Sequence, residues 1–370
     1  MTVTEDTLVF EELVLPGYER LIKITDEPSG LKAIICIHNT TLGPALGGTR
    51  IYPYASWSDA QEDVRRLARG MTYKSALAGV GLGGGKSVIM SSPGEKTAAK
   101  LLAFGRAIRK LNGLYICAED YGCSTEDAAT ISKETRFIVG LAFAKSSGDP
   151  GPFTAWGVFR GIQSVLKKTT GSDSVKDKTI AIQGLGSVGA RLAETLFWNG
   201  ARLVLCDVNE DKAKLLAKRY EAEVCSPEKI LSVECDVLAP CALGGILNDK
   251  TIPALRCQAV AGAANNQLLK DEHADLLRQR EILYAPDFVI NSGGLINVSN
   301  ELYRTPYDSR LAREQVHNVY DLLLTIYEIA EQNNYSTNRS AIELADYRLK
   351  YGIGKRLTPV HFHHEPIPLF

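Results

Sequence analysis

The chain has 370 residues, of which 45% are hydrophobic and 23% charged, and its formal net charge is −1. This length is sufficient for two domains with separate cores. The near-zero charge argues against a nucleic-acid binder, which normally carries a surplus of lysine and arginine. No apolar run of 18 residues occurs, and the acidic N-terminus is unlike a signal peptide, so we expect no membrane association. The eight cysteines form no CxxC pair, which predicts reduced thiols and a cytoplasmic protein.

The first hundred residues predict a buried strand followed by an amphipathic helix. Leu31–His38 is an apolar run without a polar face, which is typical of a buried strand. We expect His38 to make a strand-end hydrogen bond and to have no catalytic role, since no carboxylate stands near it in the sequence. Ser58–Gln61 resembles a capping box, and apolar residues follow at helical spacing as far as Met71. Lys74 should therefore lie at or just after the end of a helix.

The segment Met71–Met90 holds two lysines, Lys74 and Lys86, separated by mostly small and apolar residues that include five glycines. The ammonium form of a lysine beside bare backbone is disfavoured, so such a lysine can act as a base near neutral pH. Glycine also lets the backbone approach a ligand closely or adopt positive φ. The alternative interpretation is a glycine-rich turn with incidental lysines, because such turns are common.

A strand–helix–strand pattern follows, and it ends in two acids. Lys86–Met90 predicts a strand, residues 95–111 a helix, and Leu114–Ala118 a short strand with Glu119–Asp120 at its C-terminal end. Open α/β sheets bind ligands at such strand ends, although a carboxylate there can equally be a turn or cap residue. Ser146–Pro152 contains two prolines, two glycines and two serines, and it predicts a boundary between domains.

The second half carries a dinucleotide-binding pattern. Lys178–Gln183 predicts a strand, Gly184–Gly189 has the GxGxxG spacing, a helix runs to about residue 199, and Arg202–Asp207 predicts the next strand. These glycines permit a tight turn that brings a pyrophosphate to the helix N-terminus. Asp207 should accept hydrogen bonds from ribose hydroxyls and repel a 2′-phosphate, so the pattern favours NAD over NADP.

The remaining pattern extends the same sheet and then becomes helical. Cys235–Pro240 and Gln258–Ala263 predict further strands, Gly293 opens a helix, and residues 312–349 predict a long helical region. The tail His361–His364 has metal-binding side chains, but an exposed end without a fixed role is the favoured interpretation. We therefore expect no metal.

Seven segments resemble, in the same order, the motifs of the amino-acid dehydrogenases, the family of glutamate, leucine, phenylalanine and valine dehydrogenases. They are most similar to its leucine dehydrogenase-like branch, and they comprise Leu42–Arg50, Val80–Val88, Ala118–Asp120, Gln183–Gly189, Ala239–Gly244, Ala261–Gln267 and Pro286–Gly294. The resemblance implies a two-domain α/β fold with a cleft between the domains. A mixed α/β catalytic and oligomerisation domain would comprise residues 1–150 and a C-terminal helix at about 335–370. A Rossmann-like doubly wound NAD-binding domain would comprise residues 151–334.

The same resemblance implies NAD-dependent, reversible oxidative deamination of an apolar L-amino acid to a 2-oxo acid, ammonia and NADH. It assigns the substrate carboxylate to Lys74, activation of water to Lys86, and proton transfer to Asp120. The other substrate contacts that it implies are Leu46, Gly47, Gly48, Ala118, Asn265, Leu295 and Val298. The cofactor contacts that it implies are Thr154, Gly184, Leu185, Gly186, Ser187, Val188, Gly189, Asp207 and Asn265.

The substrate stays open at this level. The implied side-chain pocket is apolar, which would leave the second carboxylate of a dicarboxylate unpaired and favours leucine, valine or isoleucine. An aromatic substrate is the alternative, since Leu295 is also seen in aromatic-specific relatives, and Gly244–Ile246 and Gln315–Asn318 resemble the tryptophan branch. Discrimination at the scale of a methylene group is worth only about 1–3 kcal/mol, so residues alone do not decide it.

Two alternatives of other classes fit less well. A non-catalytic NAD-binding protein would be expected to have lost Lys74, Lys86 or Asp120, and all three are present. A hydroxy-acid dehydrogenase would need a base with an arginine clamp for the carboxylate. The family resemblance also implies a homo-oligomer formed through the first domain, for which an octamer is favoured and a dimer is possible.

Overall fold

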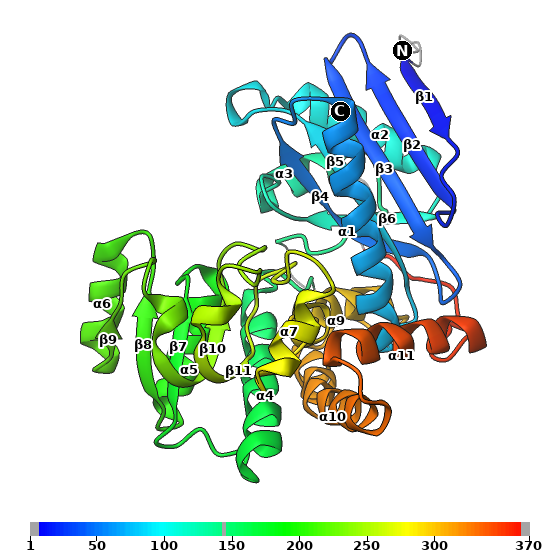
Figure 1. The fold of residues 1–370 in the computed structure, drawn as a ribbon. Helices are drawn as coiled ribbons and strands as arrows, with labels where there is room; N and C mark the ends of the chain where they lie inside the picture. Colours follow the sequence, from blue (N-terminus) through cyan, green and yellow to red (C-terminus); the bar gives the residue numbers. More distant parts are fainter. Residues whose placement is uncertain (1–6, 143–145, 364–370) are drawn as a thin grey trace. The chain divides into compact units, whose positions relative to one another are not determined.

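The computed structural model describes residues 7–142 and 146–363 (Figure 1). Internal contacts divide the chain into two compact units. Unit 1 comprises residues 1–149, 298–308 and 348–370, and unit 2 comprises residues 150–297 and 309–347. The first crossing lies between Asp149 and Pro150, inside the segment predicted as a domain boundary. Residues 335–347, which we expected in the first domain, group with unit 2, where Thr337 donates a hydrogen bond to the carbonyl of Tyr284.

Unit 1 is built on a mixed six-stranded sheet. In spatial order its strands are β1 (Leu8–Leu13), β2 (Arg20–Asp26), β3 (Leu31–Asn39), β5 (Gly83–Met90), β4 (Ala45–Tyr52) and β6 (Tyr115–Glu119). The pairs β1–β2, β2–β3 and β3–β5 are antiparallel, whereas β4 runs parallel to both β5 and β6. The C-terminal ends of β4 and β6 therefore lie at the same edge.

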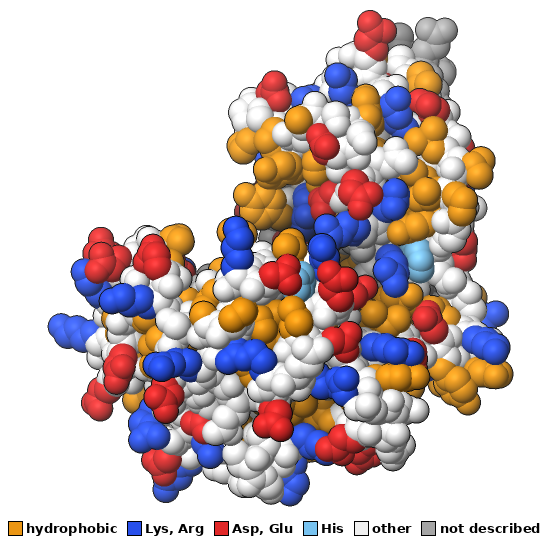
Figure 2. Space-filling view, in the orientation of Figure 1, with side chains coloured by type: hydrophobic (Ala, Val, Ile, Leu, Met, Phe, Trp, Pro, Cys, Tyr) orange, Lys and Arg blue, Asp and Glu red, His pale blue; other side chains and the backbone are white. Residues whose placement is uncertain are grey.

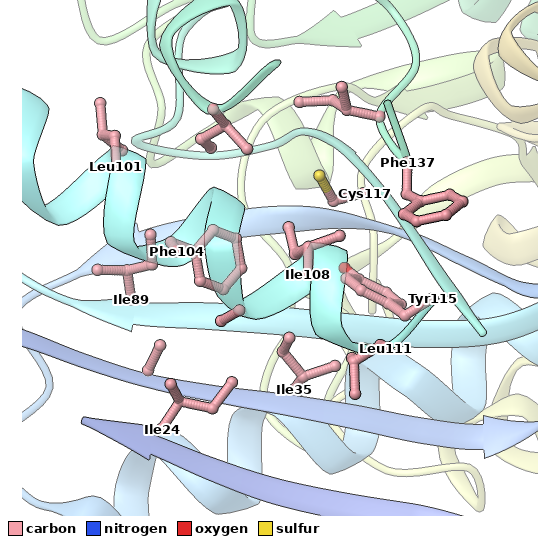
Figure 3. Close-up of a cluster of buried hydrophobic side chains, with 14 of the residues drawn as sticks. Ile24, Ile35, Ile89, Leu101, Phe104, Ile108, Leu111, Tyr115, Cys117 and Phe137 are labelled. Atoms are coloured by element: carbon pink, nitrogen blue, oxygen red, sulfur yellow. The ribbon is translucent and has the colours of Figure 1, made fainter. Parts of the chain in front are cut away.

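Helices cover both faces of this sheet. The helix α1 (Trp57–Ala78) packs on one face, where Ile34 and Cys36 of β3 meet Val64 and Ala68. The helix α2 (Ala98–Lys110) packs on the other, and Figure 3 shows Phe104 and Ile108 of α2 beside Ile35. Because β3 is buried on both faces, it lacks polar alternation. This arrangement confirms the strand predicted from its apolar run.

The boundaries of α1 differ from those predicted. Its N-cap is Ser56, whose side chain accepts a hydrogen bond from the backbone N–H of Asp59, so the cap predicted at Ser58 is wrong by two residues. The helix continues to Ala78 and ends at Gly79, which has φ of 65°. Lys74 is consequently inside the helix, one turn before its end, and the prediction that it lies at or beyond the end is wrong.

Unit 2 is a parallel, doubly wound sheet. In spatial order its strands are β12 (Leu283–Tyr284), β11 (Arg256–Val260), β10 (Glu234–Pro240), β7 (Thr179–Gln183), β8 (Arg202–Cys206) and β9 (Glu223–Val224). Every adjacent pair is parallel. The order reverses between β7 and β10, and such a switch point is where open α/β sheets bind ligands. This topology confirms the Rossmann-like fold.

The helices of unit 2 are α4 (Gly151–Thr170), α5 (Ser187–Trp198), α6 (Glu210–Tyr220), α7 (His273–Gln279), α8 (Asp287–Ile290), most of α9 (Gly293–Ser299), α10 (Ser309–Asn333) and most of α11 (Thr337–Tyr351). The helix α4 packs against both α5 and α10. The long helical region predicted over residues 312–349 is broken, because Asn334 adopts a positive φ of 56° between α10 and α11.

The surface carries both charge signs. Figure 2 shows acidic and basic side chains interspersed over the visible face of each unit, in keeping with a net charge of −1. Within residues 7–142 and 146–363, no helix combines the length and apolar character needed to cross a membrane.

Candidate active site

Lys86 is held by β5, which begins inside the glycine run. A Cβ on Gly84 would overlap the backbone of Thr72 in α1, and a Cβ on Gly85 would lie 2.9 Å from the ring of Tyr115. Glycine is required at both positions because only it lets the strand and its neighbours come this close. The strand predicted to start at Lys86 therefore starts three residues earlier, at Gly83.

The first half of the run is a turn. Gly79 donates its N–H to the carbonyl of Ser75 to cap α1, and Gly81 also has a positive φ of 65°. Arg356 of the C-terminal segment donates to the carbonyls of Val80 and Gly81 at 3.3 and 3.1 Å. The turn that leads into the lysine strand is thus tied to a segment almost 280 residues away in the sequence.

Lys86 is buried and forms an ion pair with the half-buried Asp120. Lys86 Nζ lies 3.0 Å from Asp120 Oδ2, and the lysine side chain is only 7% exposed. Gly48 on the intervening strand β4 makes room for the pair, since a Cβ there would lie 2.8 Å from Asp120 Cβ and 3.3 Å from Lys86 Nζ. The two residues assigned to proton transfer are therefore brought together, and Gly48 allows them to meet.

Asp120 has a second cationic partner, Arg50, which was not among the predicted site residues. Arg50 Nε donates to Asp120 Oδ2 at 3.2 Å, and its Nη1 donates to Asp63 Oδ2 at 2.9 Å. Burial raises the pKa of Asp120, but the charges of Lys86 and Arg50 outweigh this effect and hold it below its ordinary value. Asp120 is therefore ionised at neutral pH. Arg50 is the last residue of the family-like segment Leu42–Arg50. Its partner Asp120 lies 70 residues away, so the spacing of residues in the sequence did not indicate the pair.

Lys74 lies on α1, which packs along the lysine strand β5. One half-turn earlier, Thr72 Oγ1 is 2.8 Å from His38 Nδ1. His38 thus makes the hydrogen bond predicted for it near the end of β3. The helix and the strand that carry the two lysines are joined at this point, because Thr72 also packs against Gly84.

Most residues expected at the substrate lie in unit 1. Leu46, Gly47 and Gly48 are on β4, with Gly48 paired in register with Ala118 of β6. Val298 also groups with unit 1 and is buried beside Gly140. Leu46, Ala118 and Val298 are all apolar and at most 9% exposed. The other two expected contacts, Leu295 and Asn265, belong to unit 2.

The glycine loop of unit 2 gives each of its glycines a different constraint. Gly184 has φ of 91°, and Gly189 sits so close to the carbonyl of Gly184 that a Cβ would overlap it. Gly186 is exposed at the N-terminus of α5, with no described atom within 4 Å of a Cβ built on it. No side chain among the described residues caps this helix end. A tight turn, an open approach and a close contact are what a pyrophosphate-binding loop needs, so these residues fit a dinucleotide. Leu185, Ser187 and Val188 complete the loop.

Asp207 lies directly after β8 and is tied to that loop. Its Oδ2 accepts the N–H of Leu185 at 2.7 Å, and its Oδ1 accepts the N–H of Asn209 at 2.9 Å. A carboxylate oxygen can accept two hydrogen bonds, so each oxygen retains acceptor capacity beyond its backbone partner. The carboxylate is therefore oriented by the backbone and can still accept hydroxyl donors.

The other cofactor-side residues lie around α9. A Cβ on Gly294 would lie 2.9 Å from Thr154 Oγ1, which places Thr154 against the start of α9. Asn265 is exposed, and its Oδ1 accepts a hydrogen bond of 2.7 Å from Asn291 Nδ2. Asn291 lies within a quoted motif, but its function as a partner of Asn265 was not predicted. The only signal for it was its place before Gly293 and Gly294.

A parallel sheet with this glycine loop and strand-end acid defines a dinucleotide-binding unit, and unit 1 supplies a buried lysine paired with a carboxylate. Residues 19–137 match the family described as Glu/Leu/Phe/Val dehydrogenase, dimerisation domain, and residues 204–345 match Glutamate/Leucine/Phenylalanine/Valine dehydrogenase. The chain belongs to this family of amino-acid dehydrogenases. It is therefore an oxidoreductase that binds a nicotinamide dinucleotide.

Similar proteins include leucine, L-tryptophan and phenylalanine dehydrogenases. The chain is 47% identical to a leucine dehydrogenase of Thermoactinomyces intermedius over 92% of its own length and 93% of the relative. It is 45% identical to an L-tryptophan dehydrogenase of Nostoc punctiforme, over 92% of this chain and 96% of that protein. The crystal structure of L-tryptophan dehydrogenase from Nostoc punctiforme superposes with a TM-score of 0.80 at 43% identity, covering 91% of this chain and 97% of that one.

Proposed function

We propose that the protein catalyses the NAD-dependent, reversible oxidative deamination of an apolar L-amino acid, with leucine, valine and isoleucine favoured. The observation that carries this proposal is the ion pair between the buried Lys86 and the half-buried Asp120, which Gly48 allows to meet, in a unit whose expected substrate-lining residues are apolar. A glutamate side chain would place an unpaired charge against such a lining.

Each polar group in unit 1 has a distinct task in this proposal. Lys74 binds the substrate carboxylate as a fixed cation. Asp120 takes a proton from the substrate amine, and it later returns one to the nitrogen that leaves as ammonia. Lys86, in its neutral form, accepts a proton from the water that attacks the imine carbon. A nicotinamide held by unit 2 would supply the acceptor for the hydride that leaves the substrate Cα.

In unit 2, Gly184–Gly189 and the N-terminus of α5 bind the pyrophosphate, and Asp207 accepts hydrogen bonds from the ribose hydroxyls. Asn265 and Thr154 would lie near the nicotinamide end. We expect NAD to be used much better than NADP, because the Asp207 carboxylate would repel a 2′-phosphate. Comparable kcat/KM values for the two cofactors would overturn the assignment of Asp207.

The experiment that tests the activity is NADH formation, followed by absorbance, with a panel of leucine, valine, isoleucine, phenylalanine, tryptophan and glutamate. Highest kcat/KM with a branched-chain amino acid supports the proposal. A preference for tryptophan or phenylalanine would move the protein to the aromatic branch, a second candidate favoured by its similarity to L-tryptophan dehydrogenase. NAD binding without turnover of any amino acid would point to the non-catalytic alternative.

Assembly and location complete the proposal. We expect a homo-oligomer, with an octamer favoured over a dimer, and the match to a dimerisation domain in residues 19–137 supports this. A monomer found by light scattering at assay concentration would contradict it. All eight cysteines are free thiols, which supports a reducing compartment, the cytoplasm.

A further inference from the structure

A chain of polar contacts extends from the lysine–carboxylate pair to the opposite side of Arg50. Lys86 Nζ lies 3.0 Å from Asp120 Oδ2, and Arg50 Nε donates to the same oxygen at 3.2 Å. Arg50 Nη1 donates to Asp63 Oδ2 at 2.9 Å, and the hydroxyl of Tyr54 donates to this Asp63 oxygen at 2.5 Å. Three elements are thereby linked, because Arg50 is on β4, Asp63 on α1 and Asp120 directly after β6.

These contacts are mostly shielded from solvent. The exposed fraction of the side chain is 7% for Lys86, 21% for Asp120, 22% for Arg50 and 29% for Asp63. Interactions between charges are stronger in such surroundings than at an open surface. Burial lowers the pKa of Arg50, but Asp120 and Asp63 raise it by more, so the guanidinium stays charged.

The shared oxygen has an electrostatic consequence. Asp120 alone would stabilise the ammonium form of Lys86, and that would oppose its action as a base. Arg50 adds a positive charge on the same carboxylate oxygen, so part of the attraction of Asp120 is directed to Arg50. Asp63 and Tyr54 fix the far side of the guanidinium, which keeps its Nε directed at Asp120.

We propose that Arg50 is a positioning residue for the reaction: its guanidinium orients the Asp120 carboxylate and shares with Lys86 the charge of the same carboxylate oxygen. This inference rests on the proposed function, since it presupposes the tasks given there to Lys86 and Asp120. Arg50 itself contacts neither substrate nor cofactor in this account.

Other titratable groups also face Asp120 and must be considered in any pH experiment. They lie on β6 and on the turn that follows it, and comprise Tyr115, Glu119 and Cys123. Burial raises the pKa of Cys123 to about 12 and that of Tyr115 well above its ordinary value, so neither ionises near neutral pH. Burial also raises the pKa of Glu119, which is a further carboxyl group beside Asp120. Substitution of Arg50 should therefore change the pH at which an ionisation of the kcat/KM profile occurs, and should not add a new ionisation.

The test compares the pH profile of kcat/KM for leucine, at saturating NAD, in the parent enzyme and three variants. Removing a cation raises the proton affinity of every neighbouring group. Arg50→Gln should therefore move the acid-side ionisation by about 1 pH unit toward alkaline pH, and lower kcat/KM at neutral pH about tenfold. Arg50→Lys keeps the positive charge, so its pH profile should lie close to that of the parent enzyme. Arg20→Gln is the matched control, because Arg20 is also on the sheet of unit 1 and ion-paired, with Glu12 at 2.7 Å, but it is remote from Asp120.

A purely structural function of Arg50 predicts a different result. In that case Arg50→Gln would lower the melting temperature, or would lower kcat while the pH profile stays in place. A pH profile of Arg50→Gln that superimposes on that of Arg20→Gln overturns the inference.

If Arg50→Gln does not fold, Asp63→Asn serves in its place. Without the Asp63 carboxylate the guanidinium is no longer held toward Asp120, so the ionisation should again move toward alkaline pH, and an unmoved profile would overturn the inference. Lys86→Ala and Asp120→Asn, assayed in parallel, distinguish a failure of the proposed function from a failure of the inference about Arg50. Full activity in both overturns the proposed function, whereas inactive variants with an unshifted Arg50→Gln profile overturn only the inference.

Discussion

The glycine-rich segments of the two units look alike in sequence, but their glycines meet different structural requirements. In unit 1, Gly84 and Gly48 are strand residues, and their missing side chains let strand, helix and charged groups meet. In unit 2, Gly184 supplies a positive φ, whereas Gly186 leaves open space at the start of a helix. A glycine can therefore mark contact within the protein or room for a ligand, and a Cβ built on the backbone distinguishes the two cases.

Gly48→Ala should have the largest effect on activity among the glycine substitutions in unit 1. The added methyl group would lie 2.6 Å from the carbonyl oxygen of Glu119 and press on Asp120 and Lys86. We expect kcat to fall about 100- to 1,000-fold, because misplacing proton-transfer groups by a fraction of an ångström removes most of their contribution. NAD affinity, measured by calorimetric titration, should change less than twofold. A variant with normal kcat would show that the contact at Gly48 does not position the pair.

Lys74→Ala tests the substrate side of the same unit. A carboxylate clamp acts in the ground state and the transition state alike, so its loss should chiefly raise the amino-acid KM. The expected increase is about 10- to 100-fold, the value of a hydrogen bond to a charged group. Initial-rate kinetics with leucine measure it. A variant that loses kcat with an unchanged KM would exchange the roles of the two lysines.

Gly186→Ala tests whether the open space at the glycine loop of unit 2 serves cofactor binding. Its methyl group meets no described atom within 4 Å, so the variant should fold normally and obstruct only the pyrophosphate. We expect the Kd for NAD to rise about tenfold with an unchanged melting temperature. Gly189→Ala is the matched control, since its methyl group would overlap the carbonyl of Gly184 and should lower the melting temperature instead. Equal melting temperatures and equal affinities in both variants would refute the distinction.

The smallest effect concerns stability away from either site. Burial raises the pKa of Asp26, but hydrogen bonds from Ser29 and Thr7 outweigh it and hold the pKa below its ordinary value. A depressed pKa stabilises the fold above the unfolded-state pKa, about 3.9, and this contribution disappears as the pH falls through the folded-state value. Asp26→Asn should therefore cost about 1 kcal/mol at pH 7 and progressively less below pH 4. Thermal melts over this pH range, with kcat at pH 7 unchanged, check it.

Local pattern predicted much of this fold. The apolar run of β3, the glycine loop before α5 and the acid after β8 were all evident, because each depends on residues adjacent in sequence. The break between α10 and α11 was missed, since a positive φ at Asn334 has little local signature. The start of β5 within the glycine run was missed because its cause is contact with α1 and Tyr115, which are distant in the sequence.

The candidate site shows the same limit. Lys86 and Asp120 were identified through resemblance to a family, and the structure adds that they are in contact. Arg50 and Asn291 were not identified, because each acts through a partner, Asp120 or Asn265, that lies 26 or more residues away. Sequence spacing indicates which groups one element presents, whereas pairing between elements is decided by the register of the sheet.

In the proposed mechanism, proton transfer depends on the Lys86–Asp120 pair of unit 1, while cofactor affinity depends on unit 2. Lys86→Ala tests it most directly, with single-turnover NADH formation from leucine and the Kd for NAD measured on the same preparation. We predict that NADH formation falls by about 1,000-fold or more and that the Kd for NAD stays within twofold of the parent value. Near-normal NADH formation, or a loss that is fully explained by weaker NAD binding, would contradict the account.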